Sequence, residues 1–194
     1  MKHVFLETNW IVGVLAPAWF HDASASALLR RHFEGEIKIH VPVVAIHEAR
    51  TVLPKFKPNR VRELDGLSNW IIQEKPALSS DLESLKGSGR SVLQTFEAKW
   101  RQLLRDLCES LGGSIFPYRE AAMEMQLELD KVHVQLKPFD QAILCSVVSE
   151  ARLSKESDPD EEFLFCTLDS HLNSAECKEF AQTHGITVLR SFEV

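Results

Sequence analysis

Four acidic residues lie in or directly after apolar runs of the kind that form buried strands and helices: Glu7, Glu48, Asp140 and Asp169. Glu7 comes directly after the apolar residues 4–6, and Asp169 directly after the largely apolar residues 163–168. A buried strand gains nothing in packing from a polar end, whereas groups that do chemistry lie just past the carboxyl ends of strands in open α/β sheets. We therefore predict that the four carboxylates meet in one pocket at such an edge.

A pocket of this kind would require a cation. Four carboxylates close together repel one another, and some of them take up protons unless a cation neutralises them. Ligation by oxygen alone favours Mg²⁺ or Mn²⁺ over zinc. Either ion can lower the pKa of a bound water and stabilise charge on a phosphoryl group. The pattern therefore favours a phosphodiester as the substrate.

Taken singly, three of the acids also have purely structural explanations. Asp140 falls in the first turn of a predicted helix, where a negative charge is favourable whatever the function. Asp169 is suited to cap a helix that begins at Ser170, and Glu48 fits an exposed helical position. Glu7 is harder to explain in this way, because its flanks are apolar before it and polar after it.

The hydrophobic pattern alternates between strands and helices along the whole chain. Strands are expected at residues 3–6, 37–41, 114–116, 163–167 and 186–189. Helices are expected at residues 22–34, 43–53, 58–73, 80–111 with an interruption at 87–89, 120–130, 137–153 and 170–184, and a charged loop at 156–162. Such alternation predicts an α/β fold, in which a parallel sheet has helices on both faces and the carboxyl ends of all strands meet at one edge.

Length and composition fit one soluble domain. The chain has 194 residues, of which 44 % are hydrophobic and 26 % charged, so we expect a single domain over residues 1–194 with a helical insertion at about 55–112. No apolar run approaches the roughly 20 residues that a membrane span needs, and residues 1–6 lead straight into a strand without a signal sequence. The four cysteines show no CxxC spacing, and Cys145 and Cys166 lie in apolar runs, which favours reduced thiols and a cytoplasmic location.

The chain resembles the PIN-domain family in four segments that occur in the family's order: residues 5–9, 46–49, 139–144 and 166–171. These segments extend over nearly the whole chain, although residues 55–112 are longer and more helical than in compact members. The resemblance implies a three-layer α/β/α fold with a central parallel sheet of about five strands. It also implies a Mg²⁺- or Mn²⁺-dependent endoribonuclease that leaves 5′-phosphates.

The resemblance also implies a role for individual residues. The catalytic and metal-binding residues would be Glu7, Glu48, Asp140 and Asp169, with Thr8, Asn9 and Thr167 as their hydrogen-bonding neighbours. The family pattern has Asp at the first of these positions. The additional methylene of Glu7 leaves three outcomes open: Glu7 reaches the metal from a slightly retracted backbone, the site prefers Mn²⁺, or the site is weakened.

Basic residues near the predicted insertion are candidates for binding RNA phosphates. The net charge is −6, yet residues 55–112 hold ten basic and eight acidic residues. Lys55, Lys57, Arg60 and Arg62, together with Lys99, Arg101 and Arg105, could line the rim of the acidic pocket. A solvated face of mixed charge explains them equally well. His171 is a further candidate for a phosphate contact, with an exposed helix-start histidine as the alternative.

The sequence lacks the motifs of several other enzyme classes and leaves two alternatives to a ribonuclease open. The HExxH motif is absent because Thr51 stands at the second histidine position, and there is no glycine-rich phosphate loop and no GxSxG elbow. A catalytically weakened PIN-like scaffold that binds RNA or protein is the main alternative, and a phosphatase or phosphotransferase of another α/β family is the next. A homodimer, and an inhibitor protein of the kind found in toxin–antitoxin relatives, are left open by the sequence.

Overall fold

The computed structural model describes residues 1–15, 22–52, 62, 65, 66, 69, 73, 79–132 and 134–194. The chain divides into two compact units, one formed by Met1–Ala49 with Cys108–Val194 and the other by Arg50–Leu107. The first unit contains the sheet and all four predicted site acids. The second contains most of the segment expected to form the helical insertion. No helix in the described part of the chain is both long and apolar enough to cross a membrane.

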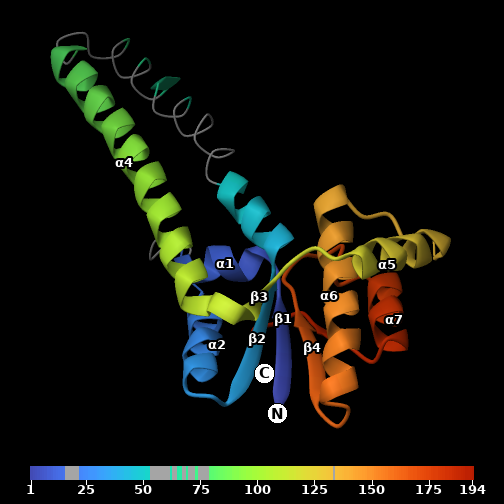
Figure 1. Cartoon of the computed structure of the whole chain (residues 1–194). Coiled ribbons are helices and arrows are strands. Elements are labelled where there is room, and N and C mark those ends of the chain that lie inside the picture. Colours follow the sequence, from blue (N-terminus) through green and yellow to red (C-terminus); the bar gives the residue numbers. More distant parts are fainter. Residues whose placement is uncertain are drawn as a thin grey trace. The chain divides into compact units, whose positions relative to one another are not determined.

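A five-stranded, entirely parallel sheet forms the centre of the first unit, which confirms the predicted α/β class (Figure 1). The strand order is β3-β2-β1-β4-β5. The strands are β1 (Lys2–Leu6), β2 (Ile37–Pro42), β3 (Ile115–Phe116), β4 (Glu162–Cys166) and β5 (Thr187–Leu189). The chain thus builds the sheet outwards from β1 in one direction, returns, and then builds it in the other.

Helices cover both faces of this sheet. In the first unit they are α1 (Thr8–Leu15), α2 (Ala23–Phe33), α5 (Glu120–Lys131), α6 (Pro138–Ser157) and α7 (Ala175–Thr183). Residues 43–52 are also helical, and α4 (Ser79–Leu111) belongs mostly to the second unit. Because parallel crossovers are right-handed, the reversal of direction after β3 sends α1 and α2 to one face and α5, α6 and α7 to the other. Figure 1 shows this division.

The central strand β1 explains why the site lies where it does. Val4, Phe5 and Leu6 are fully buried, as expected for a strand covered by helices on both faces. Strands β2 and β4 pair with β1 on either side. The residues that follow these three strands are therefore neighbours at one edge, although they are far apart along the chain.

The first helix was not predicted. Strand β1 ends at Leu6, and α1 begins two residues later at Thr8. After Asn9 the helix contains only apolar residues and a glycine, and Trp10, Ile11 and Gly13 are buried. An apolar stretch of this length shows no clear helical period in the sequence. Trp10 Nε1 donates to the carbonyl of Ala25 at 3.0 Å, which fastens α1 to α2.

Three predicted boundaries were wrong. The glycines at 87 and 89 do not interrupt α4, which is continuous from Ser79 to Leu111, because intrinsic propensity is a weak determinant within a long helix. Residues 170–173 form turns, and α7 begins at Ala175 behind the N-cap Ser174, whose hydroxyl accepts from Cys177 N. Helix α6 continues through Glu156 to Ser157, so the charged loop is shorter than expected.

The cysteines are free thiols, as expected. Cys145, Cys166 and Cys177 are fully buried, and Cys108 is half-buried. Burial raises the pKa of both the Cys145 and the Cys166 thiol to about 12. These side chains therefore pack as small apolar groups.

Candidate functional site

Glu7 is a buried carboxylate held by three hydrogen bonds. It is only 3 % exposed and stands between β1 and α1. Asn9 N donates to Oε2 at 2.7 Å, and Thr167 Oγ1 and Leu168 N each donate to Oε1 at 3.3 Å. The first donor is one of the free N–H groups of a helix N-terminus. The side chain therefore joins the end of β1 to the segment that follows β4.

Despite these donors, the ionised form of Glu7 is disfavoured. Burial raises its pKa from the ordinary value of 4.5 to about 7, and the hydrogen bonds from Asn9, Leu168 and Thr167 only partly oppose this. Near neutral pH a substantial fraction of Glu7 is therefore protonated. A nearby cation would favour the carboxylate form.

Thr8 links the first acid to the second. Its hydroxyl donates to Glu48 Oε2 at 2.5 Å, and the side chain of Thr8 is buried. Glu48 lies in the helical residues 43–52, which follow the C-terminal end of β2. The structural alternative of a fully exposed helical Glu48 is therefore wrong, since Glu48 is half-buried and bonded to the turn after β1.

Asp140 supplies the most unusual atom of the group. It is 8 % exposed and lies in the first turn of α6, which Pro138 begins behind the N-cap Lys137. Its Oδ2 is buried and has no hydrogen-bond partner in the described part of the chain. An unpaired buried carboxylate oxygen is costly. Burial, and then the negative charges of Asp169 and Glu48, raise the pKa of Asp140.

Asp169 is placed by the turn that follows β4. Its backbone N–H donates to Thr167 Oγ1 at 3.0 Å, and its Oδ1 accepts from His171 N at 2.7 Å and Leu172 N at 3.2 Å. The hydroxyl of Thr167 thus accepts from Asp169 N while it donates to Glu7. The carboxylate caps a turn rather than α7.

The structure brings all four acids to the carboxyl edge of the sheet, at the ends of β1, β2 and β4 and at the start of α6. Thr8 connects Glu7's segment to Glu48, Thr167 connects Glu7 to Asp169, and the charges of Asp169 and Glu48 act on Asp140. The carboxylates do not form a closed ligand shell. No three of them have oxygen atoms within 4.8 Å of one another, judged over the described residues.

The residues present match a hard divalent cation in chemistry. The donors are carboxylate oxygens, and one of them, Asp140 Oδ2, is buried without a partner. Oxygen donors in this number are what Mg²⁺ and Mn²⁺ take. A shared ion would require side-chain rotations that draw the oxygens together.

The basic residues predicted to bind RNA phosphates lie in different parts of the chain, and the structure describes only some of them. His171 is exposed at the turn after Asp169, and it and Lys137 oppose the rise in the pKa of Asp140 that burial and the neighbouring acids cause. Lys137 was not among the residues predicted from the sequence, although its position just before a helix-opening proline is visible there. Arg62 is exposed and helical in the second unit, and Lys55, Lys57 and Arg60 lie outside the described residues.

Comparisons with known proteins identify no family. No family model and no curated protein match the chain. A solved structure described as FitAB bound to an IR36 DNA fragment aligns with 98 % of this chain and 96 % of its own. The identity is 14 % and the TM-score is 0.46.

Proposed function

We propose that this chain is a PIN-like, Mg²⁺- or Mn²⁺-dependent ribonuclease that hydrolyses RNA phosphodiester bonds at the edge formed by Glu7, Glu48, Asp140 and Asp169. The observation that supports this most directly is the buried, unpartnered Oδ2 of Asp140, set among the charges of Asp169 and Glu48. A buried carboxylate oxygen without a partner is costly, and a bound cation would compensate for that cost.

The surrounding residues prepare the acids for this role. Hydrogen bonds from Asn9, Thr167 and Leu168 hold the Glu7 carboxylate in one orientation, and the hydroxyl of Thr8 orients Glu48. The bound cation would supply Lewis-acid stabilisation of the phosphoryl charge and activate water. Lys137 and the exposed His171 both act on Asp140, so the ammonium group of Lys137 and the imidazole of His171 are near enough to contact a substrate phosphate.

The alternative of a weakened scaffold that binds RNA without cutting it is favoured by two observations. The four carboxylates do not approach one another as a compact ligand set within the described residues. In addition, the raised pKa of Glu7, due mainly to burial, leaves it partly protonated near neutral pH. A site of low metal affinity would show both features.

The test is cleavage of labelled single-stranded RNA in Mn²⁺, with and without EDTA, by the wild type and by Asp140→Asn. The matched control is Glu156→Gln, an exposed acid on the same helix about 24 Å further along its axis. Metal-dependent cleavage that is lost in Asp140→Asn and kept in Glu156→Gln supports the proposal. Cleavage that survives EDTA or Asp140→Asn contradicts it.

Two other outcomes separate the alternatives. Binding of the RNA without cleavage, by both wild type and Asp140→Asn, supports the scaffold. Release of phosphate from a small ester while RNA stays intact supports a phosphatase. Both assays use the same protein preparations, so the RNA result and the ester result can be compared directly for each variant.

A further inference from the structure

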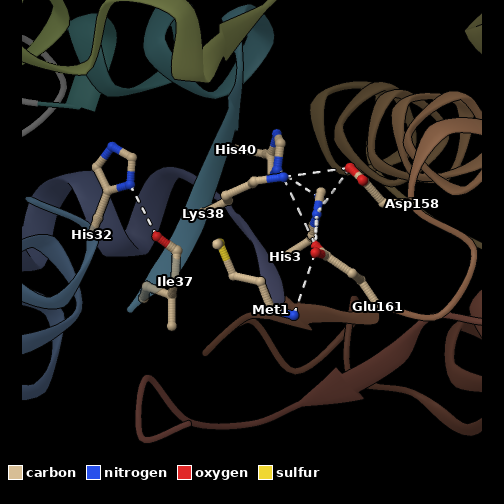
Figure 2. Close-up of polar contacts among 8 residues, drawn as sticks. All are labelled: Met1, His3, His32, Ile37, Lys38, His40, Asp158 and Glu161. Carbon is tan, nitrogen blue, oxygen red and sulfur yellow. Dashed lines mark hydrogen bonds and ion pairs between the residues drawn. The ribbon is translucent and has the colours of Figure 1, made fainter. Parts of the chain in front are cut away.

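A second polar cluster lies at the opposite edge of the sheet, near the amino ends of β1 and β4 (Figure 2). His3 Nε2 lies 2.5 Å from Glu161 Oε2 and 3.8 Å from Asp158 Oδ2. The three ligand atoms lie within 4.8 Å of one another, and no other group of three His, Cys, Asp or Glu side chains does so in the described part of the chain. His3 is only 2 % exposed.

The geometry points to a transition-metal site of the zinc type, with His3, Asp158 and Glu161 as its ligands and water completing the coordination. This site is separate from the acidic edge, the carboxyl edge of the sheet with Glu7, Glu48, Asp140 and Asp169, and it does not rest on the proposed ribonuclease activity. Imidazole nitrogen with two carboxylate oxygens is a donor set that Zn²⁺ accepts, whereas Mg²⁺ prefers oxygen alone.

The distances are close to what zinc requires. Zinc bonds of about 2.0–2.2 Å in tetrahedral geometry place neighbouring ligand atoms roughly 3.3–3.5 Å apart. The His3–Glu161 contact of 2.5 Å would have to lengthen by less than about 1 Å, and the His3–Asp158 contact of 3.8 Å would have to shorten by about half as much. Both carboxylates are on a turn and partly exposed, so small side-chain rotations suffice.

The imidazole is oriented from behind, as a metal ligand usually is. Nδ1 of His3 lies 3.1 Å from Nε2 of His40, and the two rings stack with centroids 5.0 Å apart. Without a metal, the contact between His3 Nε2 and Glu161 Oε2 needs a proton between the two atoms. A metal would displace that proton, and with the ring proton then on Nδ1, directed at His40 Nε2, the lone pair of Nε2 would face the metal. Such support of the second ring nitrogen fixes the tautomer and orientation of metal-bound histidines.

The turn that presents the two acids is itself held in place. Glu161 N donates to the carbonyl of Asp158 at 3.3 Å, which sets the two side chains on one side of the turn. The backbone nitrogen of Met1 lies 3.4 Å from Glu161 Oε1, the oxygen that does not face His3. Glu161 Oε2 is therefore the oxygen available to a metal.

A resident positive charge already lies against the same oxygens. Lys38 Nζ lies 3.4 Å from Asp158 Oδ2 and 3.9 Å from Glu161 Oε2 (Figure 2). Its side chain is 42 % exposed and can turn out to solvent. A divalent ion would replace this monovalent charge, so Lys38 acts as a built-in competitor that lowers the affinity of the site.

The test is calorimetric titration with Zn²⁺ in an Asp140→Asn/Asp169→Asn background, which removes ligands from the acidic edge. We expect one zinc per chain. Asp158→Asn should weaken binding by at least about tenfold, whereas Asp160→Asn, an exposed acid of the same turn, should leave it unchanged. Lys38→Met should tighten it. Equal weakening by Asp158→Asn and Asp160→Asn, or no zinc binding at all, overturns the proposal.

A second measurement identifies the histidine and does not depend on a disruptive variant. On addition of zinc, the Nε2 resonance of His3 in ¹⁵N NMR should shift to the position of a metal-bound nitrogen, with the ring proton on Nδ1. Zinc binding that leaves the His3 resonances unmoved overturns ligation by this residue. Circular dichroism of each variant verifies that it is folded.

Discussion

Thr167 Oγ1 lies 3.3 Å from Glu7 Oε1, although the two residues are 160 positions apart in the chain. The same hydroxyl accepts the backbone N–H of Asp169 at 3.0 Å. The buried hydroxyl of Thr167 therefore donates a hydrogen bond to Glu7 and accepts one from the backbone of Asp169. The relative position of Glu7 and Asp169 depends on this side chain.

Replacing Thr167 by Val should weaken this connection. The substitution keeps the shape but leaves Asp169 N without its acceptor and Glu7 Oε1 with one donor fewer. We expect a loss of about 1–3 kcal/mol in the free energy of unfolding, measured by urea denaturation. Thr167→Ser keeps the hydroxyl and serves as the control. Equal losses in both variants would show that the methyl group, and not the hydroxyl, matters.

Shortening Glu7 to Asp should retain or raise metal-dependent cleavage, whereas Glu7→Gln should abolish it. Only Glu7→Asp keeps a carboxylate at this position to bind the proposed metal ion. The shorter side chain draws back from Thr167 and Leu168, so Glu7→Asp should also cost about 1–3 kcal/mol of stability. RNA cleavage in Mn²⁺ and urea denaturation measure the two effects separately. Loss of cleavage in a folded Glu7→Asp protein would argue against a shared ligand role.

The Thr8–Glu48 hydrogen bond can be measured by a double-mutant cycle. The bond is 2.5 Å long and joins a buried hydroxyl to a carboxylate. Thr8→Val and Glu48→Gln should therefore be coupled by about 1 kcal/mol or more in unfolding free energy. Thr8→Val combined with Glu156→Gln, at the far end of α6, should be additive. Additivity of the first pair would mean that the contact contributes no net energy.

Asp140→Asn should stabilise the protein in EDTA at pH 8. Burial and the charges of Asp169 and Glu48 raise the pKa of Asp140, so the stability associated with its neutral form is lost as the pH rises through that pKa. A neutral amide removes this loss. Thermal denaturation should show a higher Tm for the variant than for the wild type. A lower Tm would mean that the carboxylate is stabilising without metal.

Adding Mn²⁺ should make the Tm of the wild type higher than that of Asp140→Asn. An ion that binds only the folded wild type adds about 2.7 kcal/mol at a concentration one hundred times its Kd. The Tm of the wild type should rise with Mn²⁺ concentration, and that of Asp140→Asn should stay constant. Parallel rises in both proteins would place the bound ion elsewhere.

The four thiols should differ in their reactivity with alkylating reagents according to how deeply each is buried. Burial raises the pKa of Cys145 and Cys166 to about 12 from an ordinary value of 9.0, and the thiolate is the reactive form. Alkylation of the native protein at pH 8, followed by peptide mass spectrometry, should modify Cys108 and spare the three buried cysteines. The raised pKa of Cys145 and Cys166 also predicts that stability is lost as the pH rises from about 9 towards 12. Rapid modification of Cys145 would contradict the observed burial.

The sequence alone determined the fold class, which the structure confirms, and it singled out the four acids as site candidates. Alternation of buried strands with amphipathic helices required a parallel sheet, because short connections and right-handed crossovers leave few other arrangements. The positions of Glu7 and Asp169 just beyond strands, and of Asp140 at a helix start, were visible in the local pattern. Helix α1 was not, since an apolar stretch such as residues 10–15 is compatible with several structures.

Only the tertiary structure decided how these residues are held. Strand order placed β2, β1 and β4 side by side, and burial then turned Glu7 into a group with a pKa of about 7. The His3–Asp158–Glu161 cluster was invisible in the sequence, because His3 is more than 150 residues from the two acids and shares no motif with them. Spacing along a chain encodes local geometry, whereas proximity between distant residues depends on which strands pair and which side chains lose their water.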